Sequence, residues 1–325
     1  MRRSLRAVIA MTAILASTRQ AVGESSCLYI DAHGVISQAR AIANVPSEFR
    51  ARAVCKDITP DEIAVPTDLK LGSDSRSATF GTELGPVTMR WTRAVERCFT
   101  STPSRAVGEA IKAVNRALKS GRFTADIKRA RREWSLAFTD KATAFAQFPV
   151  ALTIGRHPGF MIPPSQIYII TDFIAPDCAA SKVADELLAQ VLLHEMGHVI
   201  EYLLLDESQT LRDRERSEGF ATWFEQYSSD YSSVIPKDSV KRYYDELARQ
   251  SLQAESGGFQ GTALDYARAA LPFQAVVKKK GLATLMDVYK RIREDHQTWT
   301  EAILRATGWN RATLEREMRV VVAND

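Results

Sequence analysis

The chain has 325 residues, of which 45% are hydrophobic and 25% are charged, a composition typical of a folded protein rather than a disordered or fibrous one. Its 43 Lys and Arg exceed its 39 Asp and Glu by four, and four arginines lie in the first 23 residues. Without that segment the counts are 39 and 39. The charge therefore gives no reason to expect a nucleic-acid partner.

Residues 1–23 have the pattern of a secretory signal peptide. Arg2, Arg3 and Arg6 precede an apolar run from Ala7 to Ala16, and Ala21-Val22-Gly23 supplies small residues before the expected cleavage site. The apolar run is too short to span a bilayer. We expect export to the periplasm or the medium, with no stable membrane span once the segment is cleaved. A buried N-terminal helix is the alternative.

The cysteines are consistent with export. An even number of cysteines in an exported chain predicts two disulfides, and four cysteines allow three connectivities. We favour Cys27–Cys55, which would staple a small hairpin that begins at Cys27, together with Cys98–Cys178. Free buried thiols are the alternative.

The patterns along the chain predict an α+β fold in which a small mixed α/β region precedes a mostly helical one. Residues 24–86 are expected to form a hairpin and then a loop-rich segment, because 56–86 is rich in Pro, Gly, Ser and Asp. Residues 87–180 are expected to be mixed, and 181–325 helical. The expected elements of the mixed part are a strand at 87–91, helices at 103–118 and 124–146, and a strand at 167–170. The length suits one large core or two subdomains.

The most informative segment is His194-Glu195-Met196-Gly197-His198. It lies in a predicted helix over 182–205, for which Ser181 is a fair N-cap. Two histidines four residues apart project from one helix face and can bind one metal ion. Glu195 lies about 100° around the helix, where its carboxylate can accept a proton from a metal-bound water. The alternative is an apolar helix with two ordinary histidines, but buried imidazoles need partners.

A third ligand is needed to complete a zinc site. A ligand set that ends in a third histidine is excluded, because Glu201 and Leu204 occupy the positions where Gly and His are required. Glu218 is the best candidate. It opens a predicted helix over 219–227 that could pack antiparallel to the first, after a charged, solvated connection over 206–217. The alternative is that Glu218 is merely an acidic residue in a first helical turn.

The His194–His198 segment followed by Ser217-Glu218-Gly219-Phe220-Ala221 resembles the gluzincin clan of zinc metallopeptidases, which includes thermolysin and, more similar to this chain, the aminopeptidase-N-like enzymes. The resemblance implies one Zn²⁺ ion bound by His194, His198 and Glu218, with Glu195 as the catalytic base. It implies that Glu225 orients a ligand, whereas a solvent-facing Glu225 is the alternative.

A third segment extends the resemblance. Asp265–Ala270 is similar to the segment that carries a transition-state tyrosine in aminopeptidase-N-like enzymes. This implies that Tyr266, aided by Arg268, stabilises the oxyanion, whereas a core position is the alternative for Tyr266. In gluzincins an edge strand lines the cleft and pairs with an extended substrate, a role that we expect for residues 167–170. The resemblance covers about residues 157–320.

Two departures from the family bear on the substrate. The aminopeptidase marker Gly-x-Met-Glu-Asn, which binds a free amine, is replaced by Gly-Phe-Met-Ile-Pro at 159–163, and Thr222 replaces an Asp of thermolysin-like enzymes. We therefore expect an exported endopeptidase that acts on a peptide or protein substrate. The alternative is a catalytically silent binding or assembly protein of the cell envelope. His157, beside Pro158, is expected to be a loop residue.

Overall fold

The structure is a computed structural model. It describes residues 25–30, 36–39, 47, 54–57, 71, 74–83, 85–121, 123, 133–140, 158–162, 165–174, 184–205, 213–253, 259 and 261–323, and only the backbone of the strands before residue 71. The predicted signal peptide and His157 lie outside these residues. The chain divides into two compact units, Met1–Lys70 with Asp140–His157 and Leu71–Thr139 with Pro158–Asp325.

The first unit contains a three-stranded antiparallel sheet in the order β2-β1-β3. Its strands are β1 (Ser25–Ile30), β2 (Ile36–Ala39) and β3 (Val54–Asp57). The β1–β2 pairing confirms the predicted hairpin.

The backbone register bears on the predicted disulfides. Cys27 in β1 lies directly opposite Cys55 in β3, and opposed Cα atoms of antiparallel strands are close enough for a disulfide. Cys98 of the second unit is disulfide-bonded, but its partner is not among the described side chains. Both pairings therefore stay predictions, and the register is compatible with the first.

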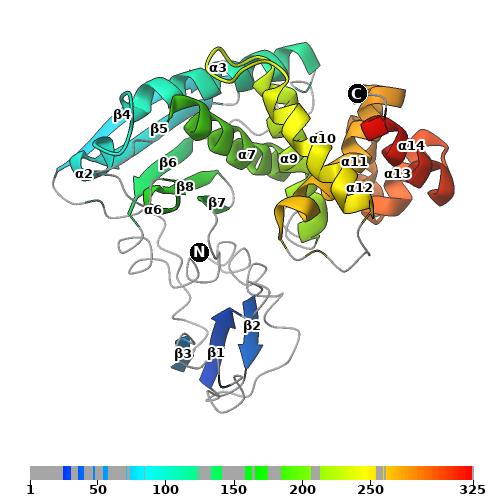
Figure 1. The fold of residues 1–325 in the computed structure, drawn as a ribbon, viewed down its shortest axis with the longest axis horizontal. Helices are drawn as coiled ribbons and strands as arrows, with labels where there is room; N and C mark the ends of the chain where they lie inside the picture. The colour runs from blue at the N-terminus through cyan, green and yellow to red at the C-terminus, as the bar shows by residue number, and fades with distance from the viewer. Residues whose placement is uncertain are drawn as a thin grey trace. The chain divides into compact units, whose positions relative to one another are not determined.

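The second unit is built on a five-stranded mixed sheet in the order β4-β5-β6-β8-β7 (Figure 1). The central strands β5, β6 and β8 are parallel, and the two edge strands pair antiparallel with their neighbours. The strands are β4 (Ser75–Thr82), β5 (Gly85–Thr92), β6 (Trp134–Thr139), β7 (Gly159–Ile162) and β8 (Gln166–Ile170). Together with the helices, this sheet confirms the predicted α+β class.

Helices cover the sheet and form the rest of the unit (Figure 1). The buried residues of α3 and α7 share one core with alternate residues of β5, β6 and β8, and this core continues into the C-terminal helices. None of the described helices has the length and apolar character needed to cross a membrane. The helices are α2 (Arg93–Glu96), α3 (Pro103–Gly121), α6 (Thr171–Ile174), α7 (Asp185–Leu204), α9 (Arg214–Ser229), α10 (Ser239–Gln253), α11 (Ala263–Lys280), α12 (Leu282–Asp295), α13 (Trp299–Thr307) and α14 (Arg311–Ala323).

Three sequence predictions about the sheet were wrong. The predicted loop over 56–86 contains β4, whose mostly exposed, polar side chains lack the apolar alternation of a typical strand. The predicted helix over 124–146 contains β6, in which Trp134, Leu136 and Phe138 alternate with smaller or polar residues and enter the core, a short period of two that the helix prediction missed. The expected edge strand at 167–170 is β8, an interior strand, because β7 pairs beyond it.

Two predicted helix starts were also wrong. The helix α7 begins at Asp185 with Ala184 as its N-cap, rather than after Ser181, and no side chain caps it. In place of a capping side chain, the negative charges of Asp185 and Glu186 in the first turn stabilise the positive end of the helix dipole. The helix α9 begins at Arg214 with Asp213 as a hydrogen-bonding N-cap, so part of the expected solvated connection is helical.

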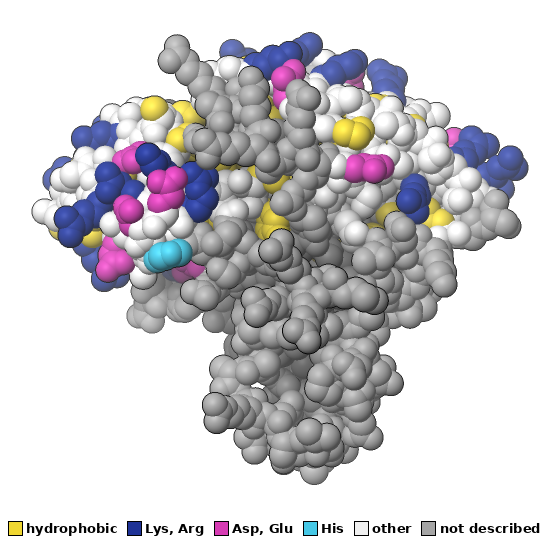
Figure 2. Space-filling model, turned by 180° about the vertical axis from the view of Figure 1, so that it is seen from behind, with side chains coloured by type: hydrophobic (Ala, Val, Ile, Leu, Met, Phe, Trp, Pro, Cys, Tyr) yellow, Lys and Arg dark blue, Asp and Glu magenta, His cyan; other side chains and the backbone are white. Residues whose placement is uncertain are grey.

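The described surface carries mixed charge. On the face in Figure 2, basic and acidic side chains lie among one another and hydrophobic ones form small patches. Of the described large hydrophobic residues, Leu187 and Tyr243 are the exposed ones.

Candidate metal centre

The two helices of the centre, α7 and α9, pack antiparallel, as the sequence predicted. Residues near the start of α7 contact residues near the end of α9, from the Gln190–Glu225 hydrogen bond to the Glu201–Arg216 ion pair. Between these contacts, a Cβ atom added to Gly197 would lie 2.8 Å from the Ala221 Cα. The absence of a side chain at Gly197 therefore permits the backbones to approach closely.

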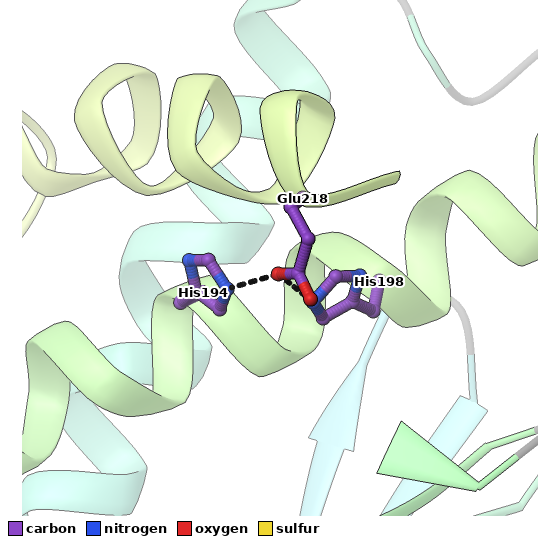
Figure 3. Close-up of side chains that lie close together, drawn as sticks. All are labelled: His194, His198 and Glu218. Atoms are coloured by element: carbon purple, nitrogen blue, oxygen red, sulfur yellow. Dashed lines mark hydrogen bonds and ion pairs between the residues drawn. The ribbon is translucent and has the colours of Figure 1, made fainter. Parts of the chain in front are cut away.

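This approach brings three side chains together (Figure 3). The Oε2 atom of Glu218 lies 3.3 Å from Nε2 of His194 and 3.2 Å from Nε2 of His198. One potential ligand atom from each residue lies within 4.8 Å of the others. All three side chains are half-buried, so the group is shielded but still accessible to a small molecule.

The spacing suits a tetrahedral ion. Ligand atoms that bind zinc at about 2.0–2.1 Å in tetrahedral geometry lie about 3.3 Å from one another. The two measured nitrogen–oxygen separations of 3.2 and 3.3 Å have this value. His194, His198 and Glu218 can therefore hold a metal ion, and two imidazoles with one carboxylate form a ligand set that zinc accepts.

The other ring nitrogen of each histidine also has a partner. Nδ1 of His194 lies 3.2 Å from Oε2 of Glu225, and Nδ1 of His198 lies 3.1 Å from the Ser217 hydroxyl. An Nδ1–H that donates to an oxygen leaves Nε2 unprotonated and fixes the ring. Both rings are thus oriented with Nε2 toward Glu218.

Glu225 is itself held in place by two donors from different helices. Gln190 of α7 donates to Oε1 at 2.7 Å, and the Tyr244 hydroxyl of α10 donates to Oε2 at 3.1 Å. The predicted contact between Glu225 and a histidine is present. The two donors were not predicted, since no local pattern indicates them.

Glu195 lies next to the metal group and next to the sheet edge. It is 5% exposed, and its Oε2 has no hydrogen-bond partner among the described residues. A Cβ atom added to Gly159 of β7 would lie 2.7 Å from its Oε1 atom. The carboxylate therefore sits against the backbone of the edge strand, with one oxygen that no donor in the described part of the chain binds.

Tyr266 of α11 also lies at the centre. Its ring meets the His194 ring edge-on at 5.9 Å between centroids. Nε of Arg214 lies 3.7 Å from Oε1 of Glu218, and the charge of this guanidinium opposes the rise in the pKa of Tyr266. The structure thus places a guanidinium from α9 close to a metal ligand and near the phenol. Arg268 forms an ion pair of 3.6 Å with Asp265, and its expected help to Tyr266 stays a prediction.

Burial and neighbouring charges shift the pKa values of the titratable groups at this centre in different directions. Burial raises the pKa of Glu195 above its ordinary value. Burial also opposes charge on His194 and Glu218, but their mutual hydrogen bond and nearby opposite charges outweigh it, so the pKa of His194 is raised and that of Glu218 is lowered. Burial raises the pKa of Tyr266, and the Glu218 charge adds to this effect. Without metal, the group therefore favours a protonated imidazole beside a carboxylate.

Close contact on the other side of α9 places Tyr266 near the ligands. A Cβ atom added to Gly219, the residue after Glu218, would collide with the backbone carbonyl of Ala269 in α11. Ala269 lies about one helical turn beyond Tyr266. The glycine therefore permits α11 to approach the helix that carries the third ligand.

No protein-family model matches the chain, and no curated protein matches it.

Proposed function

We propose that the protein is a zinc-dependent endopeptidase of the gluzincin type. The observation that carries the proposal is the convergence of His194, His198 and Glu218, through their Nε2 and Oε2 atoms, beside the buried carboxylate of Glu195. A metal-binding protein without turnover needs the three ligands, but it has no need of a buried carboxylate next to them.

The residues have separate roles in this proposal. A zinc ion held by the three ligands would lower the pKa of a bound water and polarise a carbonyl group. Glu195 accepts the proton of the attacking water and returns it to the leaving amine, and its raised pKa brings it closer to neutral pH, where such transfers are efficient. Tyr266 keeps its proton at neutral pH and can donate it in a hydrogen bond to the oxyanion.

The edge strand supports a peptide as substrate. Among the described residues, β7 pairs on one side only, with β8. An extended peptide could add to its other side by main-chain hydrogen bonds, and it would then pass Glu195 at Gly159. Gly159–Ile162 contains no carboxylate to bind a free amine, which favours cleavage within chains.

The test compares cleavage of a fluorogenic peptide library by the wild type, Glu195→Gln and Glu186→Gln, each with its zinc content measured. Glu186 is an exposed residue of the same helix and serves as the matched control. We expect cleavage by the wild type and Glu186→Gln, and a loss of about 10²–10⁴-fold in Glu195→Gln without loss of zinc. Near neutral pH, metal-free Glu195→Gln should melt no lower than the wild type, because it removes a buried charge.

Two results would contradict the proposal. Equal cleavage by the wild type and Glu195→Gln would remove Glu195 from the reaction. Stoichiometric zinc in the wild type without cleavage of any library member would favour a silent binding protein.

A further inference from the structure

A second buried cluster lies one helical turn from the metal ligands. Arg216 of α9 donates through Nε to Oε1 of Glu201 in α7 at 2.9 Å, and the Tyr289 hydroxyl of α12 donates to the same oxygen at 2.8 Å. The three residues are 4%, 0% and 1% exposed, respectively. The cluster thus joins three helices through one carboxylate oxygen.

The position of this cluster is set by the sequence spacing of the ligands. Glu201 follows His198 by three residues, about one turn of α7, so it lies on the same helix face. Arg216 precedes Glu218 by two residues in α9. The ligand pair His198–Glu218 therefore lies between the Gly197–Ala221 contact on one side and the Glu201–Arg216 ion pair on the other.

Stability alone is a poor explanation for this cluster. A buried ion pair loses much of its Coulombic gain to desolvation, and apolar residues of similar volume often stabilise a fold equally well or better. The second oxygen of Glu201, Oε2, is buried and has no hydrogen-bond partner in the part of the chain that the structure describes, which adds a further cost. Unlike apolar packing, the two hydrogen bonds of the cluster are directional, so they tolerate little sliding or rotation of the helices.

We propose that Glu201, Arg216 and Tyr289 act as a positioning cluster that fixes the rotation and the slide of α9 on α7, so that Glu218 meets both histidines at the spacing of a metal ion. This inference rests on the proposed metal site. Because Tyr289 belongs to α12, the cluster also ties the ligand helices to the C-terminal helices. The three residues do not touch the substrate or the reacting atoms.

The experiment replaces the ion pair by apolar side chains of similar length in Glu201→Met/Arg216→Met. The matched control is Lys279→Met/Glu317→Met, which removes an ion pair of 3.3 Å between α11 and α14. Three quantities are measured for each protein: the melting temperature without metal, the zinc dissociation constant by chelator competition, and kcat on a library peptide.

We expect the melting temperature of the Glu201→Met/Arg216→Met protein to change little, because the desolvation cost that the ion pair no longer incurs offsets the loss of the acceptor for the Tyr289 hydroxyl. The double variant should nevertheless bind zinc about tenfold more weakly, with a kcat lower by up to about 100-fold because the reacting groups are displaced. The control should keep the zinc affinity and kcat of the wild type. Tyr289→Phe, which keeps the ring and removes one hydrogen bond, should also weaken zinc binding, and it decides the matter if the double variant does not fold.

The outcomes separate the two proposals. A folded double variant, or a folded Tyr289→Phe, with wild-type zinc affinity and kcat would overturn the positioning role and leave the proposed function intact. A wild type that binds no zinc would overturn the proposed function, and this inference with it.

Discussion

The close contact between Gly159 and Glu195 allows the proposed base to be displaced without changing the metal ligands. A Cβ atom at position 159 would lie 2.7, 2.8 and 3.0 Å from Oε1, Cγ and Cδ of Glu195. Ordinary van der Waals contact begins at 3.4 Å, so Gly159→Ala requires the oxygen to move by 0.7 Å, the difference between 3.4 and 2.7 Å. The carboxylate is 5% exposed and has little room to move without repacking.

The expected result is a specific loss of turnover. Displacement of a reacting group by about 1 Å can cost about 10²-fold in rate, so we expect kcat of Gly159→Ala to fall by roughly 10- to 100-fold. The overpacking should cost about 1–3 kcal/mol of stability. Zinc content should not change, because the nearest atoms to the new methyl group all belong to Glu195.

The assay measures kcat, KM, zinc content and melting temperature for the wild type, Gly159→Ala and Gly81→Ala. Gly81 lies in β4 at the other edge of the same sheet, and a Cβ atom there has no atom within 4 Å. Gly81→Ala should therefore behave as the wild type. Our reasoning is refuted if folded Gly159→Ala keeps the wild-type kcat, or if it loses zinc as well as activity.

Two further predictions concern the partners of the ligands. Tyr244→Phe removes the hydrogen bond to Glu225 and should weaken zinc binding about tenfold in a chelator competition; an equal loss in Tyr243→Phe, an exposed neighbour, would contradict this. The second prediction concerns pH. Because the pKa of His194 is raised, zinc must displace a proton from this imidazole, so the zinc affinity should rise with pH until that pKa is passed. Without metal, the raised pKa of His194 stabilises the fold below pH 6.5, and this contribution is lost as pH rises through the folded-state pKa. The lowered pKa of Glu218 stabilises it above pH 4.5, and this contribution is lost in stronger acid. A zinc affinity and a metal-free melting temperature that both stay constant from pH 5 to 8 would contradict the second prediction.

The ligand helices were predictable because their signal is local. Two histidines one turn apart, followed by a glutamate at the start of the next apolar helix, determine most of the geometry once the two helices pack antiparallel. The sequence also indicated Glu225, which falls on the same face of α9 as Glu218. The structure brings these residues together through side-chain contacts that the spacing anticipated.

The remaining groups of the site come from elements that spacing does not relate to the ligands. Tyr244 arrives on α10, and its contact with Glu225 depends on how two helices pack. Arg214 was assigned to a solvated connection, because its charged neighbours conceal a helix start that Asp213 caps. Such contacts depend on tertiary packing, which short-range patterns do not record.

The errors in the sheet have a physical origin as well. In β6, the large apolar residues Trp134, Leu136 and Phe138 do alternate with smaller ones, but the alternation spans only six residues and was missed inside a longer predicted helix. In β4, only Ala78 and Phe80 are apolar and pack against the core, and the other side chains are mostly polar and exposed. Local periodicity identifies strands such as β5, whose alternate residues are buried along most of the strand, and it is a weak signal where the alternation is short or rests on two apolar residues.

Two glycines, one in each of the helices that carry the metal ligands, limit how this centre could be transplanted into another protein. Gly197 and Gly219 allow α9 to touch α7 on one side and α11 on the other, backbone against backbone. A designer who copied only the histidines, the acids and the tyrosine onto an ordinary helical bundle would find the helices about 8–10 Å apart and held there by their side chains. The metal ligands and the tyrosine would then be too far apart to act together. The two glycines would therefore have to be copied along with the reactive side chains.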